Sequence, residues 1–167
     1  MWYVIQTLKG KERKAVADIR KDVAEPDEDV FIMENEKMFK LGGVWKPERK
    51  NLFPGYLFVV TERAEEFNLS LHGRFRTLKL MTVDGDIVPI QPEEEEFLMR
   101  LGGEEHVVKY SEGFLDGDEI VIETGPMKGL AGKIRKLYRH NREALITIRL
   151  FGRDMDVRLG VGIVKKI

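Results

Sequence analysis

Residues 117–137 read GDEIVIETGPMKGLAGKIRKL, and this stretch carries the clearest structural pattern of the chain. A Gly-Asp turn leads into a strand rich in Val and Ile, and Gly125-Pro126 then forms a tight corner. Glycine has no Cβ, so it accepts positive φ angles and close backbone contacts. The later glycines and a second, increasingly basic strand predict a small, sharply bent β-barrel. A plain β-hairpin with a solvated basic edge is the alternative for this fragment taken alone.

The sequence that follows Asp116 shows only strand patterns. Short apolar runs separated by turn residues predict strands at 119–123, 130–138, 144–151, 155–159 and 162–166. Their number and spacing are typical of a five-stranded barrel over 116–167. Residues 102–115 lack a strong pattern and predict a linker with one weak strand.

The N-terminal part alternates between strand and helix patterns. Strands are predicted at 2–5, 30–41, 44–52, 56–60, 78–83 and 87–90, and helices at 10–23, 62–72 and 92–101. The run at 56–60 is almost entirely apolar, which predicts a central strand covered on both faces. Acidic Glu93–Glu96 suits the first turn of the last helix. This order predicts an α+β sandwich, an antiparallel sheet flanked by helices, over 1–101.

The composition narrows the possible classes of protein. The chain has 167 residues, 43% of them hydrophobic, and no cysteine, which excludes disulfides and suits a reducing cytosol. The start, MWYVIQTLKGKERK, lacks the pattern of a signal peptide, and no segment has the roughly 20 apolar residues of a membrane span. We therefore expect a cytoplasmic protein without membrane contact.

Charge is distributed unevenly along the chain. From Asp116 onward there are 11 Lys/Arg and 7 Asp/Glu, whereas the preceding part is acidic, and the formal net charge of the whole is -1. This change of sign suggests that the C-terminal part meets a polyanion, although an excess of this size can also arise by chance.

Catalytic chemistry finds no support in the sequence. His72, His106 and His140 are far apart and none belongs to a metal-ligand pair. The glycines between 125 and 132 lie between predicted strands, not ahead of a helix, so they do not form a nucleotide-phosphate loop. We expect no enzyme activity, no cofactor and no metal.

Two clusters suggest binding. Aromatic side chains gather at the turn 53–56, where they form either a docking cavity or part of the core. The loop Tyr138–Arg142 combines an aromatic ring, two arginines, a histidine and an amide, which suits RNA, although it is also a possible polar hairpin turn.

These motifs resemble the NusG family of transcription elongation factors over essentially the whole chain. Leu52–Val59, with its Phe-Pro-Gly-Tyr segment, is similar to a family signature, and residues 117–132 look like the KOW motif. Phe151-Gly152-Arg153 matches a third family motif. The resemblance implies an N-terminal NGN domain at 1–101 and a C-terminal KOW barrel at 116–167.

The resemblance also implies partners. The NGN domain would bind the clamp helices of the RNA polymerase β′ subunit, through Phe53, Tyr56 and Gln6 with support from Trp2 and Pro54. The KOW barrel of housekeeping members binds ribosomal protein S10 or Rho. No partner subunit of the same chain is implied, so a monomer is expected.

This chain departs from the housekeeping pattern at Met127 and at 154–159, positions that help to form the usual protein-binding surface. The departures resemble the specialised LoaP subgroup, which implies antitermination on selected operons with an RNA hairpin contact. The expected RNA-binding residues are Lys128, Lys133, Arg135, Lys136, Arg139, His140, Arg142 and Arg153. A housekeeping factor and a ribosome-associated KOW protein are the alternatives.

Overall fold

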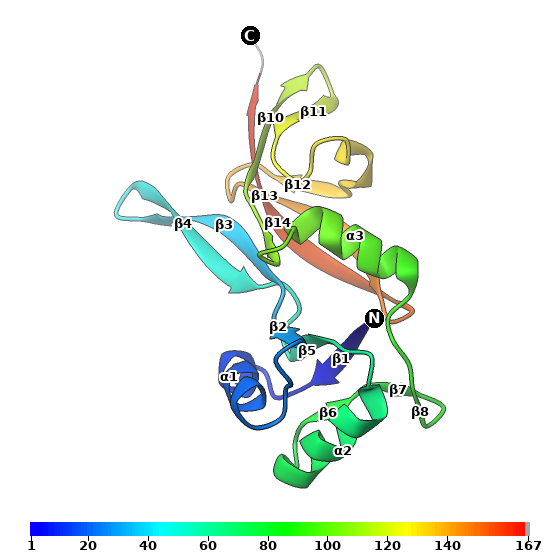
Figure 1. Cartoon of the computed structure of the whole chain (residues 1–167). Coiled ribbons are helices and arrows are strands. Elements are labelled where there is room, and N and C mark those ends of the chain that lie inside the picture. The colour runs from blue at the N-terminus through cyan, green and yellow to red at the C-terminus, as the bar shows by residue number, and fades with distance from the viewer. Residues whose placement is uncertain (166–167) are drawn as a thin grey trace. The chain divides into compact units, whose positions relative to one another are not determined.

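The computed structural model describes residues 1–165, and its ribbon is shown in Figure 1. The chain forms two compact units. The first contains Met1–Met33 and Phe53–Glu95, and the second begins with Glu34–Leu52 and continues from Glu96. Neither unit is continuous in sequence, because the segment Glu34–Leu52 of the second unit interrupts the first. The predicted α+β class is confirmed by helices and antiparallel sheets in the structure.

The first unit is built on a four-stranded sheet in the order β2-β5-β1-β6. Its strands are β1 (Trp2–Gln6), β2 (Asp29–Phe31), β5 (Tyr56–Val60) and β6 (Lys79–Leu80). The prediction that 56–60 is a central strand is confirmed, because β5 lies between β2 and β1 and Leu57, Phe58 and Val59 have no exposed surface.

Alternating side chains give this sheet two apolar faces. Tyr3 and Ile5 of β1 join a buried cluster with Ile19 of α1 (Glu12–Asp22) and Phe67 of α2 (Ala64–Arg74). Aromatic rings form a second cluster: Trp2, Phe31 and Phe58 of the sheet and Phe53 of the turn before β5 pack with ring centroids 5.0–5.9 Å apart. Burial on both faces explains why the strands of this sheet are apolar almost throughout.

The prediction of one strand over 78–83 is wrong, because β6 pairs with β1 whereas residues 82–83 form a strand of a separate two-stranded sheet, and the strand predicted at 87–90 covers only 86–87. The turn at Asp84-Gly85 joins β7 (Thr82–Val83) and β8 (Asp86–Ile87), and both turn residues have positive φ. Helix α3 (Pro92–Gly102) begins here, and its Glu94 carboxylate accepts a hydrogen bond of 3.0 Å from the Gln91 N–H. Such a contact satisfies a backbone donor at a helix start, as expected of the acidic first turn.

The second unit contains a three-stranded sheet in the order β4-β3-β9. Its strands are β3 (Glu34–Leu41), β4 (Val44–Asn51) and β9 (Val107–Val108). The prediction of one strand over 30–41 is wrong, because β2 pairs with β5 whereas β3 pairs with β4. Burial still alternates through Phe31, Met33 and Asn35, so the sequence pattern does not reveal the change of partner.

The second unit also contains a five-stranded sheet in the order β11-β10-β14-β13-β12. Its strands are β10 (Ser111–Asp116), β11 (Glu119–Thr124), β12 (Lys136–Tyr138), β13 (Glu143–Leu150) and β14 (Arg153–Lys165). Five strands were predicted, but β10 comes from the expected linker, and the predicted strands at 155–159 and 162–166 form the single strand β14 as far as Lys165, while residue 166 lies outside the described residues.

Strand β14 changes partner along its length. It pairs antiparallel with β13 as far as Gly160 and parallel with β10 from Val161 onward. The segment 130–138 also differs from the prediction, since a 3₁₀ turn at Ala131–Lys133 precedes the short β12. Among residues 1–165, no helix is long and apolar enough to cross a membrane.

Candidate nucleic-acid interface

The glycine-rich corner at 125–129 is fixed by close packing against β10. Gly125 has φ of 97°, and a Cβ there would lie 2.5 Å from the Ser111 hydroxyl oxygen. That hydroxyl, which is fully buried, accepts a hydrogen bond of 3.0 Å from the Met127 N–H. Met127 is itself fully buried. The sequence difference at this position therefore changes the packing of the corner and not its exposed surface.

Three of the expected RNA-binding residues on the basic stretch contact neighbouring side chains. The Lys133 ammonium lies 5.3 Å from the ring centroid of Phe97, and that of Lys136 lies 5.0 Å from the ring of Tyr138. Arg135 forms an ion pair of 2.8 Å with Asp156. The ion pair offsets the charge of Arg135, whereas the two lysines keep their charge and are held against aromatic rings.

Arg158, which also adds charge to the barrel surface, is held in the same manner. Its guanidinium lies 3.8 Å from the ring centroid of Tyr138 and its Nε lies 2.8 Å from a carboxylate oxygen of Glu143. Of the two nearby aspartates, Asp154 lies 3.3 Å from Arg149, whereas Asp156 pairs with Arg135 and not with Arg158.

Arg142 links the turn between β12 and β13 to two aromatic side chains. Its guanidinium lies 4.3 Å from the ring centroid of Trp45 on β4, and Arg142 lines the same cavity as Tyr110. Burial raises the pKa of the Tyr110 hydroxyl, and Arg142 opposes this shift. Arg142 is thus half-buried and already contacts side chains of the second unit.

The other four expected RNA-binding residues differ in this respect. Their side chains are exposed, and within the described part of the chain they form no ion pair, hydrogen bond or ring contact: these are Lys128, Arg139, His140 and Arg153. They lie on the 125–129 corner, on the β12–β13 turn and at the start of β14. Free cations on turns are well placed to contact phosphates.

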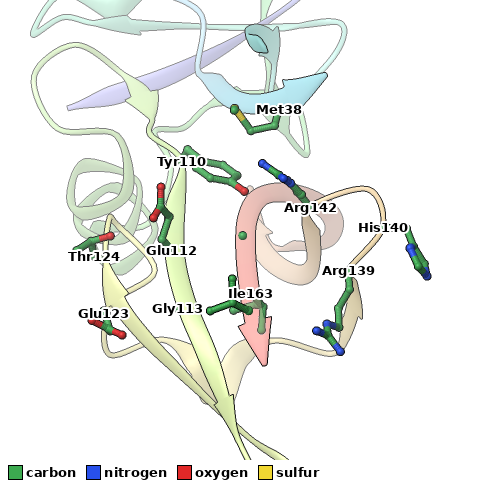
Figure 2. Close-up of a pocket in the computed structure, with 12 residues that line it drawn as sticks. Met38, Tyr110, Glu112, Gly113, Glu123, Thr124, Arg139, His140, Arg142 and Ile163 are labelled. Atoms are coloured by element: carbon green, nitrogen blue, oxygen red, sulfur yellow. The ribbon is translucent and has the colours of Figure 1, made fainter. Parts of the chain in front are cut away.

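A cavity of about 730 Å³ lies beside two of these residues, Arg139 and His140, and is shown in Figure 2. Tyr110 and Glu112 line one side of it and Arg139 and Arg142 the other, while His140 stands at the outer rim. Its apolar lining comes from Met38, Ile163 and Val164. Sequence reasoning missed Tyr110 and Glu112, because they lie in the segment expected to be a linker.

Two glycines of β14 make room for the Tyr110 ring. A Cβ on Gly162 would lie 2.2 Å from the Tyr110 hydroxyl oxygen, and a Cβ on Gly160 would lie 2.9 Å from its Cδ2. The Gly-Val-Gly sequence at 160–162 is therefore the signal that could have located this wall of the cavity. Only residues without a side chain allow an aromatic ring to lie so close to a strand.

Of the five expected polymerase-binding residues, two are buried in the core and three are exposed or half-buried. Phe53 has no exposed surface and Trp2 is 5% exposed, so both belong to the aromatic cluster of the first unit. Pro54 and Gln6 are exposed and Tyr56 is half-buried. Gln6 and Tyr56 are paired in the β1–β5 ladder, which brings these two side chains together.

The fold and these surfaces define a binding protein that combines a mixed α/β unit with a small, partly basic β-sheet. A family model described as transcription termination factor NusG matches residues 1–99, more than half of the chain. The chain therefore belongs to the NusG family, whose members act as transcription termination and antitermination factors.

Individual relatives agree over nearly the whole length. The transcription termination/antitermination protein NusG of Thermus thermophilus is 25% identical, with 95% of this chain and 94% of that protein covered. NusG of Bacillus subtilis is also 25% identical, with coverage of 95% and 93%. A solved structure titled "Domain interaction in Thermotoga maritima NusG" has a TM-score of 0.56 at 23% identity, covering 95% of this chain and 92% of that one, which supports the same fold.

Proposed function

We propose that this chain is a specialised NusG-family factor, resembling LoaP, that promotes processive antitermination on selected operons. It binds the clamp helices of the RNA polymerase β′ subunit through its NGN domain at 1–101. After a connecting segment at 102–115, its KOW domain at 116–167 binds an RNA hairpin. In this proposal the protein works in the cytoplasm as a monomer.

The observation that carries the RNA part is the set of exposed Lys, Arg and His side chains on the turns of the five-stranded sheet that have no partner within residues 1–165. Arg139 and His140 on one turn, together with Lys128 and Arg153, have no partner among the described residues. Phosphate contacts by such side chains supply most of the affinity in sequence-independent binding and make it depend on salt. The engaged cations Lys133, Arg135, Lys136 and Arg142 would have a supporting role.

The polymerase part is supported by the corner at 53–56. Pro54, Gln6 and Tyr56 present exposed surface beside one another, whereas Phe53 and Trp2 form the packed base beneath that corner. A docking surface of this kind needs a rigid aromatic anchor, and Tyr56 is the candidate. Phe53 and Trp2 would then act by holding the corner in place.

The RNA proposal is tested by fluorescence anisotropy with GC-rich RNA hairpins across a range of salt concentrations. Arg139→Gln should weaken binding by about 1.5–3 kcal/mol if it contacts a phosphate directly. The matched control is Arg149→Gln, because Arg149 is exposed but paired with Asp154. Equal affinities for wild type and Arg139→Gln at low salt would contradict the RNA assignment.

A protein ligand for the five-stranded sheet is the second candidate. Val164 near the end of β14 is 66% exposed and lines the same cavity as Met38 and Ile163, so a protein ligand can contact apolar surface there. This would correspond to a housekeeping factor that binds ribosomal protein S10 or Rho. Binding of S10 by the full chain, without measurable binding to any hairpin, would favour this alternative.

A further inference from the structure

The cavity beside Tyr110 contains both signs of charge. Arg139, His140 and Arg142 line it, and so do the carboxylates of Glu112 and Glu123. Neither carboxylate forms an ion pair within the described part of the chain, although cations line the same cavity. Two unpaired carboxylates are unexpected in a site that serves only for phosphate, because they repel it.

A carboxylate selects ligands by what they donate. Ionised Glu accepts hydrogen bonds and donates none, so Glu112 and Glu123 need N–H groups from a ligand. The nucleic-acid bases differ in this respect, and their edges are accessible to side chains where RNA is unpaired. Guanine presents two adjacent donors, N1–H and the N2 amino group, which match the two oxygens of one carboxylate. Uracil presents a single N–H between two carbonyl oxygens that a carboxylate repels.

The remaining lining suits the body of a nucleotide. Tyr110, Met38 and Ile163 offer aromatic and apolar surface for the faces of a base. Arg139, whose guanidinium is free among the described residues, lies across the cavity from Glu112 (Figure 2) and can contact the phosphate. A cavity of about 730 Å³ falls within the range of small-ligand pockets and is large enough for one nucleotide.

We propose that this cavity binds a single unpaired guanine of an RNA, with the base edge on Glu112 and the phosphate on Arg139. This inference rests on the proposed function, because it assumes that the ligand of the five-stranded sheet is RNA. It adds a specificity element: the free cations hold the backbone of any hairpin, and the carboxylate selects the unpaired base.

The test uses the full chain and one GC-paired RNA hairpin with a single bulged nucleotide, measured by fluorescence anisotropy. The bulge is guanine, inosine, adenine, cytosine or uracil, and a fully paired stem is the reference. Wild type should prefer the guanine bulge over uracil by on the order of ten-fold. Inosine lacks the N2 amino group, so it should bind with intermediate affinity.

The variant that tests the carboxylate is Glu112→Gln, and its matched control is Glu119→Gln on the neighbouring strand β11. Both residues are exposed, so neither substitution should unfold the protein. Glu112→Gln should remove the preference for guanine over inosine and slightly raise affinity for the fully paired stem, because a repelling charge is lost. Glu119→Gln should retain the wild-type preference.

Three results would overturn the inference. Equal affinity for guanine and uracil bulges, with tight binding to all hairpins, would exclude the guanine site while leaving the proposed RNA function intact. An unchanged guanine preference in Glu112→Gln would exclude the assigned carboxylate. A wild-type protein that binds no hairpin but still co-purifies with RNA polymerase would show that the RNA part of the proposed function, and with it this site, is wrong.

Discussion

The Arg142 guanidinium lies 4.3 Å from the ring centroid of Trp45, so a cation from the β12–β13 turn covers an aromatic ring on β4. Cation–π pairs of this kind form where the ring face is partly desolvated. Arg142 also has a φ of 55°, a left-handed conformation that costs energy for a residue with a long side chain. The contacts with Trp45 and Tyr110 therefore compensate for a strained turn.

Trp45→Ala should lower the free energy of unfolding by about 0.5–2 kcal/mol beyond the loss of ring burial, because Arg142 loses its aromatic partner. Urea denaturation of wild type, Trp45→Ala, Arg142→Gln and the double variant gives the interaction free energy of the Trp45–Arg142 pair. The control is Phe39→Ala on β3, whose ring is 48% exposed. Additive effects of Trp45→Ala and Arg142→Gln would show that the pair contributes nothing.

Gly162→Ala should be destabilising, by about 1–3 kcal/mol, because the new methyl group would overlap the Tyr110 hydroxyl. Gly132→Ala is the matched control, since a Cβ there meets nothing within 4 Å. Adding Tyr110→Phe to Gly162→Ala removes the closest atom and should recover part of the loss. Thermal or urea unfolding measures all four proteins, and equal stability of the two alanine variants would contradict the close contact.

Phe53→Ala should lower the free energy of unfolding by about 3–5 kcal/mol, because Phe53 is fully buried against Phe58. Tyr56→Ala should leave stability nearly unchanged and reduce co-purification with RNA polymerase. The control is Leu69→Ala on α2, an apolar side chain that is 74% exposed. Full retention of polymerase by a folded Tyr56→Ala protein would exclude Tyr56 as the anchor.

Asp156 provides a test of pH dependence. The Thr147 hydroxyl, which donates a hydrogen bond of 2.7 Å, and Arg135 hold the pKa of this carboxyl below its ordinary value of 3.8. Because the folded-state pKa is lowered, its contribution to stability is present above the ordinary value and is lost as the pH falls through the folded-state value. The contribution is small, since the pair is exposed.

The measurement compares urea midpoints of wild type and Asp156→Asn. Wild type should be slightly more stable at neutral pH, and the difference should disappear at a pH below the folded-state pKa of Asp156. Asp118→Asn, which changes an exposed carboxylate in a turn, is the control. A difference between wild type and Asp156→Asn that persists in acid would mean that the substitution acts through packing.

Local signals predicted much of this fold. The apolar run at 56–60, the Asp84-Gly85 turn and the acidic helix start at 93–96 each depend on neighbouring residues, and each is present in the structure. The break between β2 and β3 was not predictable, because burial continues to alternate across it. Strand β10 was assigned only to a linker with one weak strand, because Ser111–Asp116 has few apolar residues and no regular alternation, although it pairs with its neighbour β11 as well as with the distant β14.

The candidate site was predictable in its charge and not in its geometry. The abundance of basic side chains on 128–142 is visible in the sequence, but which of them contact other side chains depends on partners such as Phe97 and Asp156 that lie elsewhere in the sequence. Phe53 illustrates the same difficulty, because an aromatic residue at a turn reads equally as surface or core. Its burial follows from packing against Phe58.

The change of partner along β14 affects the order in which the protein can assemble during synthesis. The β13–β14 hairpin is local in sequence, whereas β10 and the β3–β4 hairpin are made earlier and contact β14 only after the last strand has left the ribosome. Until then β10 has an unpaired edge, a known route to aggregation in nascent chains. Strands β3 and β4 carry charged side chains, including Lys37, Lys46 and Glu48, and charges of this kind oppose edge-to-edge pairing with other chains.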